Sequence, residues 1–146
     1  MPNATSAGRT ILLVDDDPDD RFLTRKAWQE AGIGWPLREL EGGQQAIDYL
    51  AGAAAASSPR PAMILLDLKM PGTSGFEVLA WIRGSDAWRR LPVVILTAST
   101  SPDDAAEAYR LGANSVLVKP SSIQEFAEIL AAFNNYWLRF NVFPEP

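Results

Sequence analysis

Short apolar runs recur along the chain, and four of them are followed at once by a polar residue of a particular kind. Each of these runs is continuous rather than alternating, which is typical of a strand buried on both faces of a sheet. The four runs are Ile11–Val14, Met63–Leu66, Val93–Leu96 and Val116–Val118. A fifth segment, Leu37–Leu40, alternates and predicts a strand nearer the sheet edge. The pattern therefore predicts five strands.

Amphipathic segments with helix-start signals separate these runs. Asp17–Pro18 and Ser101–Pro102 place an N-cap residue before a proline, and Ser121–Gln124 has the spacing of a capping box. The alternation of strand and helix, five times over, predicts an α/β fold whose parallel sheet is covered on both faces through right-handed crossovers. A chain of 146 residues suits one such domain with one core.

Two of the predicted helices carry apolar stripes that should pack on the sheet, because their apolar residues recur at spacings of three and four. In the first helix the stripe is Phe22, Leu23, Ala27, Trp28 and Ala31, and in the last it is Ile123, Phe126, Leu130, Phe133, Trp137 and Phe140. Trp28, Trp81 and Trp88 are expected to serve packing rather than ligand binding.

The polar residues at the strand ends predict a functional site. Asp15 and Asp16 follow the first strand, Asp67 the third, Thr97 the fourth and Lys119 the fifth. In a doubly wound sheet, ligands bind beyond the carboxyl ends of the strands. Three carboxylates in one small volume repel one another, so either their pKa values rise or a cation joins them. Mg²⁺ is the hard, oxygen-binding ion that fits best, and Mn²⁺ is also compatible.

This arrangement assigns Asp67 the role of a nucleophile. A carboxylate can attack phosphorus in line, and the charge that spreads over the equatorial oxygens would be stabilised by the metal, the Lys119 ammonium and the Thr97 hydroxyl. Asp17 is better explained as a helix cap, and the pair Asp19–Asp20 as a complement to the helix dipole.

Composition excludes several other function classes. The chain has no His and no Cys, so zinc sites, imidazole catalysis and disulfides lack their usual groups. A net charge of −5 argues against nucleic acid as a partner. The segment from Met1 to Arg9 has no apolar signal core, and the longest apolar stretches are too short to cross a bilayer. A cytoplasmic protein without a membrane association is therefore expected.

Four motifs together resemble those of the response-regulator receiver domain. They are the runs from Ile11 to Asp17, from Leu66 to Gly72 with Gly75, from Leu96 to Ala98 and from Val118 to Pro120, and the resemblance covers Arg9 to about Ala132. It implies a flavodoxin-like fold with strand order 2-1-3-4-5 and five helices. The expected organisation is a flexible N-terminus over residues 1–8, a receiver domain over 9–140 and a tail over 141–146.

The resemblance also implies residue roles. Asp67 would be phosphorylated by a partner histidine kinase, so the chain would be a phosphoacceptor switch rather than an enzyme that acts on other molecules. Asp16 would bind the metal directly, Asp15 mainly through water, and Lys69 through its backbone carbonyl. Thr97 would be the switch hydroxyl.

Three further positions follow from the same resemblance. Lys119 would bind the phosphoryl group, Ala98 would leave access to it, and the bond from Lys119 to Pro120 would be cis. The family often has an aromatic residue three positions before the lysine, and here that position is Val116. The usual coupling between the threonine and an aromatic ring is therefore not expected in this chain.

The end of the chain carries its own signal. Tyr136–Leu138, with Asn141 and Pro144, resembles the single-domain regulators that partner bacterial phytochromes. Together with Trp137 and Phe140, Phe143 is expected to form an apolar arm, which predicts a homodimer through the last helix and the tail. The alternative is an arm folded back on its own domain. Output is expected through protein contact or a phosphorelay.

Two other functions remain as alternatives. A small phosphohydrolase with an aspartyl nucleophile would need an acidic residue two positions after Asp67, where this chain has Lys69. A pseudo-receiver, which keeps the fold without the switch, is favoured only by Val116 and is opposed by the intact set of strand-end residues.

Overall fold

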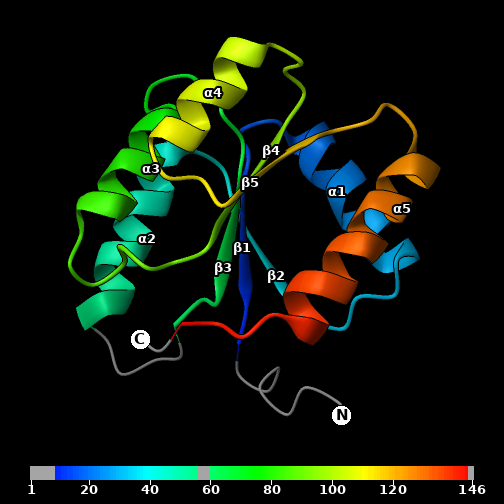
Figure 1. Ribbon diagram of the computed structural model, residues 1–146, viewed down its shortest axis with the longest axis horizontal. Helices are drawn as coiled ribbons and strands as arrows, with labels where there is room; N and C mark the ends of the chain where they lie inside the picture. Colours follow the sequence, from blue (N-terminus) through cyan, green and yellow to red (C-terminus); the bar gives the residue numbers. More distant parts are fainter. Residues whose placement is uncertain (1–8, 56–59, 145–146) are drawn as a thin grey trace.

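The computed structural model describes residues 9–55 and 60–144, and within them strands and helices alternate as predicted (Figure 1). The order is β1 (Ile11–Val14), α1 (Pro18–Glu30), β2 (Leu37–Leu40), α2 (Gly43–Ala55), β3 (Met63–Leu66), α3 (Gly75–Gly84), β4 (Val93–Thr97), α4 (Pro102–Arg110), β5 (Ser115–Val118) and α5 (Ile123–Phe133). The expectation of a flexible segment over residues 1–8 lies outside the described residues.

The five strands form one parallel sheet in the order β2-β1-β3-β4-β5, so the predicted flavodoxin-like topology is confirmed. β1 lies between β2 and β3, where Val14 is in register with Leu40 on one side and with Leu66 on the other. Thr97 at the end of β4 is in register with Val118 on β5. The residues that follow β1, β3 and β5 therefore leave the sheet at the same edge as the end of β4.

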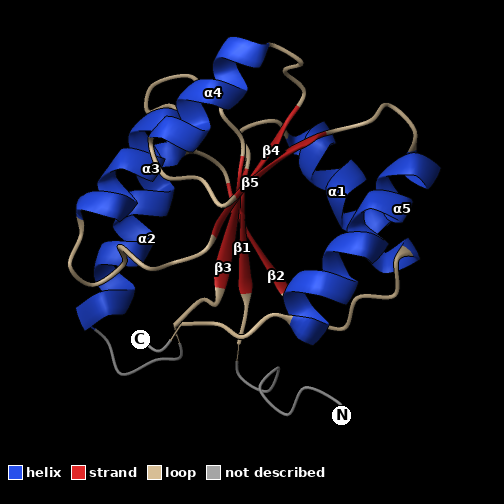
Figure 2. Ribbon diagram, in the orientation of Figure 1, coloured by secondary structure: helices blue, strands red, loops and turns tan. Residues whose placement is uncertain are grey.

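Helices cover both faces of the sheet (Figures 1 and 2). α1 and α5 lie on one face, where they cover Ile11, Leu13 and Leu65, and the other helices lie on the opposite face over Leu12 and Ile64. Alternate residues of each strand therefore point into two separate apolar cores, which explains why the runs are apolar throughout. Within residues 9–55 and 60–144, every helix is too short or too polar to span a bilayer.

The predicted packing role of Trp28 and Trp88 is confirmed. Both side chains are buried, and each indole N–H donates to a backbone oxygen, that of Trp35 at 2.9 Å and that of Leu50 at 2.7 Å. Buried indoles keep their apolar contacts without an unsatisfied donor in this way.

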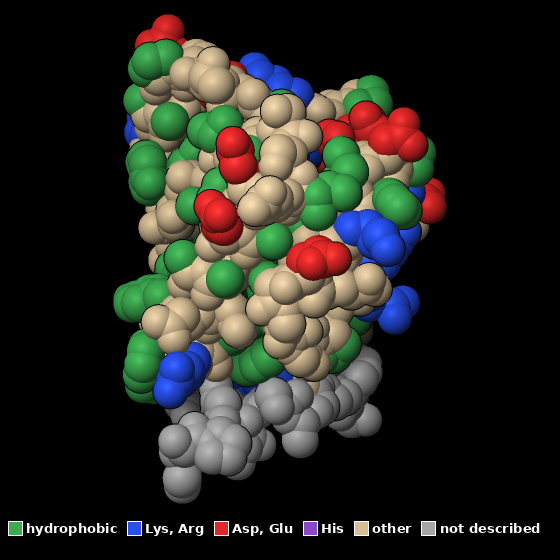
Figure 3. Space-filling model, turned by 90° about the vertical axis from the view of Figure 1, so that its right-hand side faces the viewer, with side chains coloured by type: hydrophobic (Ala, Val, Ile, Leu, Met, Phe, Trp, Pro, Cys, Tyr) green, Lys and Arg blue, Asp and Glu red, His purple; other side chains and the backbone are tan. Residues whose placement is uncertain are grey.

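The predicted apolar stripe of α1 is partly wrong. Its buried residues are Thr24, Ala27 and Trp28, whereas Phe22 and Leu23 are exposed. Phe22 precedes Thr24 by two positions, roughly 200° around a helix of 3.6 residues per turn, and so faces away from the sheet. Figure 3 looks onto the side where α1 and α5 lie and shows apolar side chains interspersed with acidic and basic ones.

The start of α5 also differs from the expectation by one residue. The N-cap is Ser122, whose hydroxyl accepts a hydrogen bond from the Glu125 N–H at 3.1 Å, and not Ser121 with Gln124. Ser122 and Glu125 have the same capping-box spacing, and a glutamate in the first turn complements the helix dipole. Ser122 with Glu125 therefore caps the helix better than Ser121 with the neutral Gln124.

The last predicted stripe fails beyond Phe133 because α5 continues as a π-helical segment, η2 (Asn134–Phe140). Backbone hydrogen bonds there span five residues. The Asn141 N–H, for example, donates to the Tyr136 oxygen at 2.7 Å. The buried series becomes Phe133 and Leu138, five positions apart, while Phe140 is 63% exposed. Ile123, at the other end of the stripe, is also exposed.

Candidate functional site

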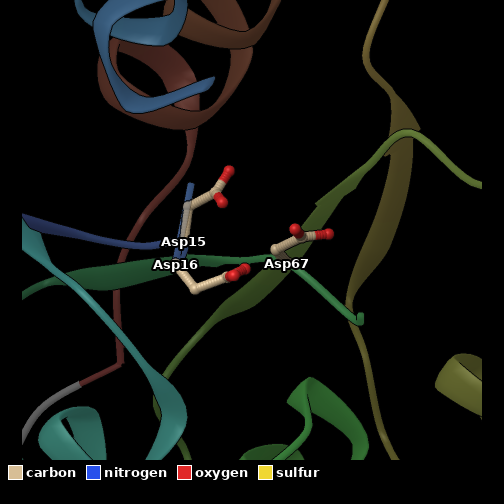
Figure 4. Close-up of side chains that lie close together, drawn as sticks. All are labelled: Asp15, Asp16 and Asp67. Carbon is tan, nitrogen blue, oxygen red and sulfur yellow. The ribbon is translucent and has the colours of Figure 1, made fainter. Parts of the chain in front are cut away.

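The three carboxylates predicted to meet at the strand ends do so. Asp15 and Asp16 project from the end of β1 and Asp67 from the end of β3, and the Asp16 carboxylate extends toward Asp67 (Figure 4). One carboxylate oxygen from each of the three lies within 4.8 Å of the others. Asp15 is 1% exposed and Asp67 is 8% exposed, whereas Asp16 is half-buried. The pleat and the shared strand register bring these distant residues together.

Lys119 reaches the cluster from the end of β5. Its Nζ lies 2.6 Å from Asp15 Oδ2, 3.3 Å from Asp20 Oδ2 and 3.7 Å from Asp67 Oδ2. Burial disfavours the ammonium, but the hydrogen bond to Asp15 and the charges of Asp67, Asp15 and Asp20 outweigh it and raise the pKa of Lys119. The lysine is therefore held as a cation among carboxylates.

The expectation of a cis bond between Lys119 and Pro120 is wrong. The described residues contain no cis peptide bond. The Lys119 N–H donates to the Thr97 oxygen at 2.8 Å, which continues the pairing of β5 with β4 past the end of the strand. The trans isomer is the intrinsically favoured one for a residue before proline, and with it the ammonium already reaches Asp15.

Asp67 has one engaged and one freer oxygen. Oδ1 accepts a hydrogen bond from the Leu68 N–H at 2.8 Å, whereas Oδ2 lies toward Lys119. Burial raises the pKa of Asp67, and the charge of Asp15 raises it further, against the lowering effects of Lys119, the Leu68 N–H and a hydrogen bond from Thr97. The ionised carboxylate is therefore under electrostatic strain that an added cation would relieve.

The donor set fits a hard divalent cation. Three carboxylates converge beside the Lys119 ammonium, and that ammonium is already bonded to Asp15. Within residues 9–55 and 60–144, no group donates a hydrogen bond to the Asp16 carboxylate, which leaves its oxygens available. Oxygen ligands of this kind are those that Mg²⁺ and Mn²⁺ prefer.

Thr97 ends β4, the strand beside β3, and Lys69 follows Asp67 by two residues. Thr97 is 2% exposed, and its Oγ1 accepts a hydrogen bond from the Ser99 N–H at 3.1 Å. The Lys69 side chain is exposed and turns away from the carboxylates to pair with Asp104 at 3.2 Å. The site therefore brings together Asp15, Asp16, Asp67, Thr97 and Lys119, while the Lys69 side chain lies outside it.

Sequence reasoning missed two residues that support the site. Asp20, interpreted only as a dipole complement, contacts Lys119, and an Nη1 of Arg21 donates to the Asp15 backbone oxygen at 2.7 Å. Both lie in the first turn of α1, which begins two residues after the acidic pair, and this closeness in sequence is the signal that could have pointed to them. The predicted cap is confirmed, since Asp17 accepts from the Asp19 N–H at 2.9 Å.

Val116 is half-buried on β5, and its N–H donates to the hydroxyl of Tyr109 at 3.2 Å. Tyr109 belongs to α4 and is exposed. A tyrosine therefore contacts this position from the neighbouring helix, although the position itself carries no ring.

A five-stranded parallel sheet in this order, with an acidic cluster and a lysine at the strand ends, defines a receiver domain. A sequence profile described as the response regulator receiver domain matches residues 11–131. The chain belongs to this family. It is a response regulator of two-component signalling and is homologous to phytochrome response regulators.

Related proteins come from different biological settings. A probable methanogenesis regulatory protein, FilR2 of Methanothrix harundinacea, is 38% identical over 93% of this chain and 88% of its own length. The response regulator RPA3017 in red light signaling of R. palustris is 32% identical, with a TM-score of 0.86 over 94% of this chain and 99% of that one.

Two cyanobacterial proteins are similar over the same extent, 94% of this chain and 99% of theirs. The phosphorylated phytochrome response regulator RcpA is 31% identical with a TM-score of 0.83. The Mn²⁺-bound form of Rcp1, a protein of Synechocystis, is 33% identical with a TM-score of 0.82.

Proposed function

We propose that this response regulator accepts a phosphoryl group on Asp67 from a partner histidine kinase, with Mg²⁺ bound beside it. The observation that carries the proposal is the meeting of Asp67 with Asp15, Asp16 and the Lys119 ammonium at one edge of the sheet. Asp16, Asp67 and the Lys69 backbone carbonyl would hold the ion directly, and Asp15 mainly through water. Mn²⁺ fits the same oxygen donors, and the relative Rcp1 has an Mn²⁺-bound form.

Each side chain then has a separate task. Asp67 Oδ2, the oxygen without a backbone hydrogen bond, forms the bond to phosphorus as the bond to the donor breaks, and the donor atom leaves with the electron pair. Lys119 and Thr97 bind the oxygens of the transferred group. A bound divalent ion neutralises carboxylate charge and polarises the phosphoryl oxygens.

Incubation with acetyl phosphate and Mg²⁺, followed by intact-mass measurement, tests this function. The wild-type protein should gain the mass of one phosphoryl group, and Asp67→Asn should gain none. No gain by the wild type, or a gain that persists in Asp67→Asn, would defeat the assignment. The alternative of a phosphohydrolase is not favoured, because the position that would need an acid is Lys69, whose ammonium pairs with Asp104.

The proposed kinase partner is of the bacteriophytochrome class, because relatives of this chain have names that link them to phytochrome or red light. The proposed site of action is the cytoplasm. Red-light-dependent transfer of labelled phosphate from such a kinase, at a rate above that to an unrelated receiver, is the expected result. Equal transfer to both receivers would contradict the pairing.

We further propose a homodimer formed through η2 and the tail. Phe140 is exposed and Val142 is 90% exposed, so this end of the domain presents unpartnered apolar surface. Part of the predicted arm folds back instead, since the Phe143 ring lies 5.7 Å from that of Trp35 and Trp137 is half-buried. Phe143 therefore joins the end of the chain to the sheet-covering side of the domain at Trp35.

A further inference from the structure

The direction of the Thr97 hydroxyl is set by a hydrogen bond from the loop that follows β4. A hydroxyl offers one proton and two lone pairs. The Ser99 N–H occupies one lone pair of Thr97 Oγ1 at 3.1 Å, and the interaction with the Thr97 side chain lowers the pKa of Asp67. The hydrogen bond from Ser99 therefore leaves the Thr97 proton free to point toward the Asp67 carboxylate.

Ser99 is in turn held by Asp104, in the first turn of α4. Ser99 Oγ donates to Asp104 Oδ2 at 2.6 Å and accepts from the Ser101 N–H at 3.2 Å. The Asp104 N–H donates to Ser101 Oγ at 3.3 Å, the bond that caps α4. The loop between β4 and α4 is thus closed into a small frame in which each side chain has a partner.

Lys69 holds the same carboxylate from the other side. Its Nζ lies 3.2 Å from Asp104 Oδ1, so both oxygens of Asp104 are engaged. Because Lys69 follows Asp67 by two residues, Asp104 joins the segment after β3 to the segment after β4. The exposed ion pair between Lys69 and Asp104 adds little to overall stability. The hydrogen bond from Ser99 to the charged Asp104 carboxylate is short and directional. The two contacts therefore fix the position of the loops that they join.

We propose that Asp104 is a positioning residue for phosphoryl transfer to Asp67, acting through Ser99 on the hydroxyl of Thr97. The inference rests on the proposed function. Without the acceptor at position 104, Ser99 loses the shorter of the two hydrogen bonds to its Oγ. Its N–H is then held less firmly against Thr97 Oγ1, and the Thr97 proton is directed away from Asp67 for part of the time.

The first test compares rates of phosphorylation by acetyl phosphate at saturating Mg²⁺. Asp104→Ala should lower the maximal rate about tenfold, less than the 10²–10³ lost when a transition-state donor is itself deleted. The acetyl phosphate concentration at half-maximal rate should stay the same. Asp104→Asn should recover most of the rate, because its amide oxygen still accepts from Ser99.

Asp103→Ala is the matched control, since Asp103 is an exposed acid in the same first turn of α4. Its rate should stay within about twofold of the wild type, as a surface substitution away from such contacts predicts. An equal loss in Asp103→Ala and Asp104→Ala would mean a general effect on the helix and would overturn the positioning role.

A double-mutant cycle with Thr97→Ala decides the route of the effect. In the Thr97→Ala background, Asp104→Ala should cause no further loss of rate. The same tenfold loss in that background, or a raised Mg²⁺ requirement in Asp104→Ala, would show action by another route and overturn the inference. A wild-type protein that takes no phosphoryl group would contradict the proposed function itself, whereas normal wild-type phosphorylation with an unchanged Asp104→Ala rate would contradict only the role of Asp104.

Discussion

At the scale of residues, the site is an unbalanced group of charges that one buried lysine holds together. Lys119 contacts Asp15, Asp20 and Asp67, and its side chain is 8% exposed. Removal of one partner from a buried ion pair lowers stability much more than removal of one partner from an exposed pair, because the remaining buried charges lose their compensation.

Lys119→Met is therefore expected to lower the free energy of unfolding by about 3 kcal/mol or more in EDTA. Urea unfolding followed by tryptophan fluorescence measures this change. Excess Mg²⁺ should restore part of the loss, since a bound cation stabilises the native state by mass action. Lys26→Met is the control, because Lys26 is exposed on α1. Equal unfolding midpoints for the two variants would contradict the structural role given to Lys119.

The raised pKa of Asp67 predicts a pH dependence of stability in metal-free protein. Burial raises the native pKa above the ordinary value of 3.8, so the native state binds the proton more tightly than the unfolded chain. Stability is then lost as the pH rises from that ordinary value through the native pKa. Asp67→Asn should lack this loss and unfold with a free energy about 0.5–2 kcal/mol higher at pH 7 in EDTA. If the unfolding free energies of the two proteins changed in parallel from pH 4 to 8, the raised pKa of Asp67 would be contradicted.

At the scale of elements, the strands and the site were predictable for one reason. Each apolar run ends beside its functional residue, so Asp15, Asp67, Thr97 and Lys119 are placed by the sheet alone. The frame around Asp104 was not predictable, because its hydrogen bonds join two loops whose conformations no periodicity encodes. The apolar stripe predicted beyond Phe133 was wrong because π-helical winding replaces a spacing of three and four with one of five.

The docking of α3 against the end of β3 makes its own prediction. A Cβ on Gly75 would lie 2.0 Å from the Asp67 backbone oxygen and 2.8 Å from Leu68 Cα, whereas a Cβ on Gly84 would meet nothing within 4 Å. Gly75→Ala should thus destabilise the protein by about 3 kcal/mol or prevent folding, as overpacking against backbone does.

Gly84→Ala, in the same helix, is the matched control. It should raise stability by about 0.5 kcal/mol through the lower entropy of the unfolded chain. Chemical denaturation of both variants measures the difference. If Gly75→Ala were as stable as Gly84→Ala, α3 would not pack on β3 as closely as described.

At the scale of the whole molecule, the exposed apolar end predicts self-association. Phe140→Ser with Val142→Ser should shift the protein from dimer to monomer in light scattering without loss of stability, since both side chains are exposed. Phe143→Ala should instead lower stability, because its ring packs on Trp35. Identical monomer masses for the wild type and the double variant would remove the dimer proposal.

The carboxyl group of Asp67 receives the phosphoryl group in the proposed reaction, and every other residue of the site acts on that transfer. Borohydride reduction after incubation with acetyl phosphate and Mg²⁺ converts an aspartyl phosphate to homoserine, and peptide mass spectrometry then locates the change. Homoserine at position 67, absent when EDTA replaces Mg²⁺, is the predicted result. Homoserine at position 15 or 16, or at none of the aspartates in a protein that has gained the phosphoryl mass, would contradict the account.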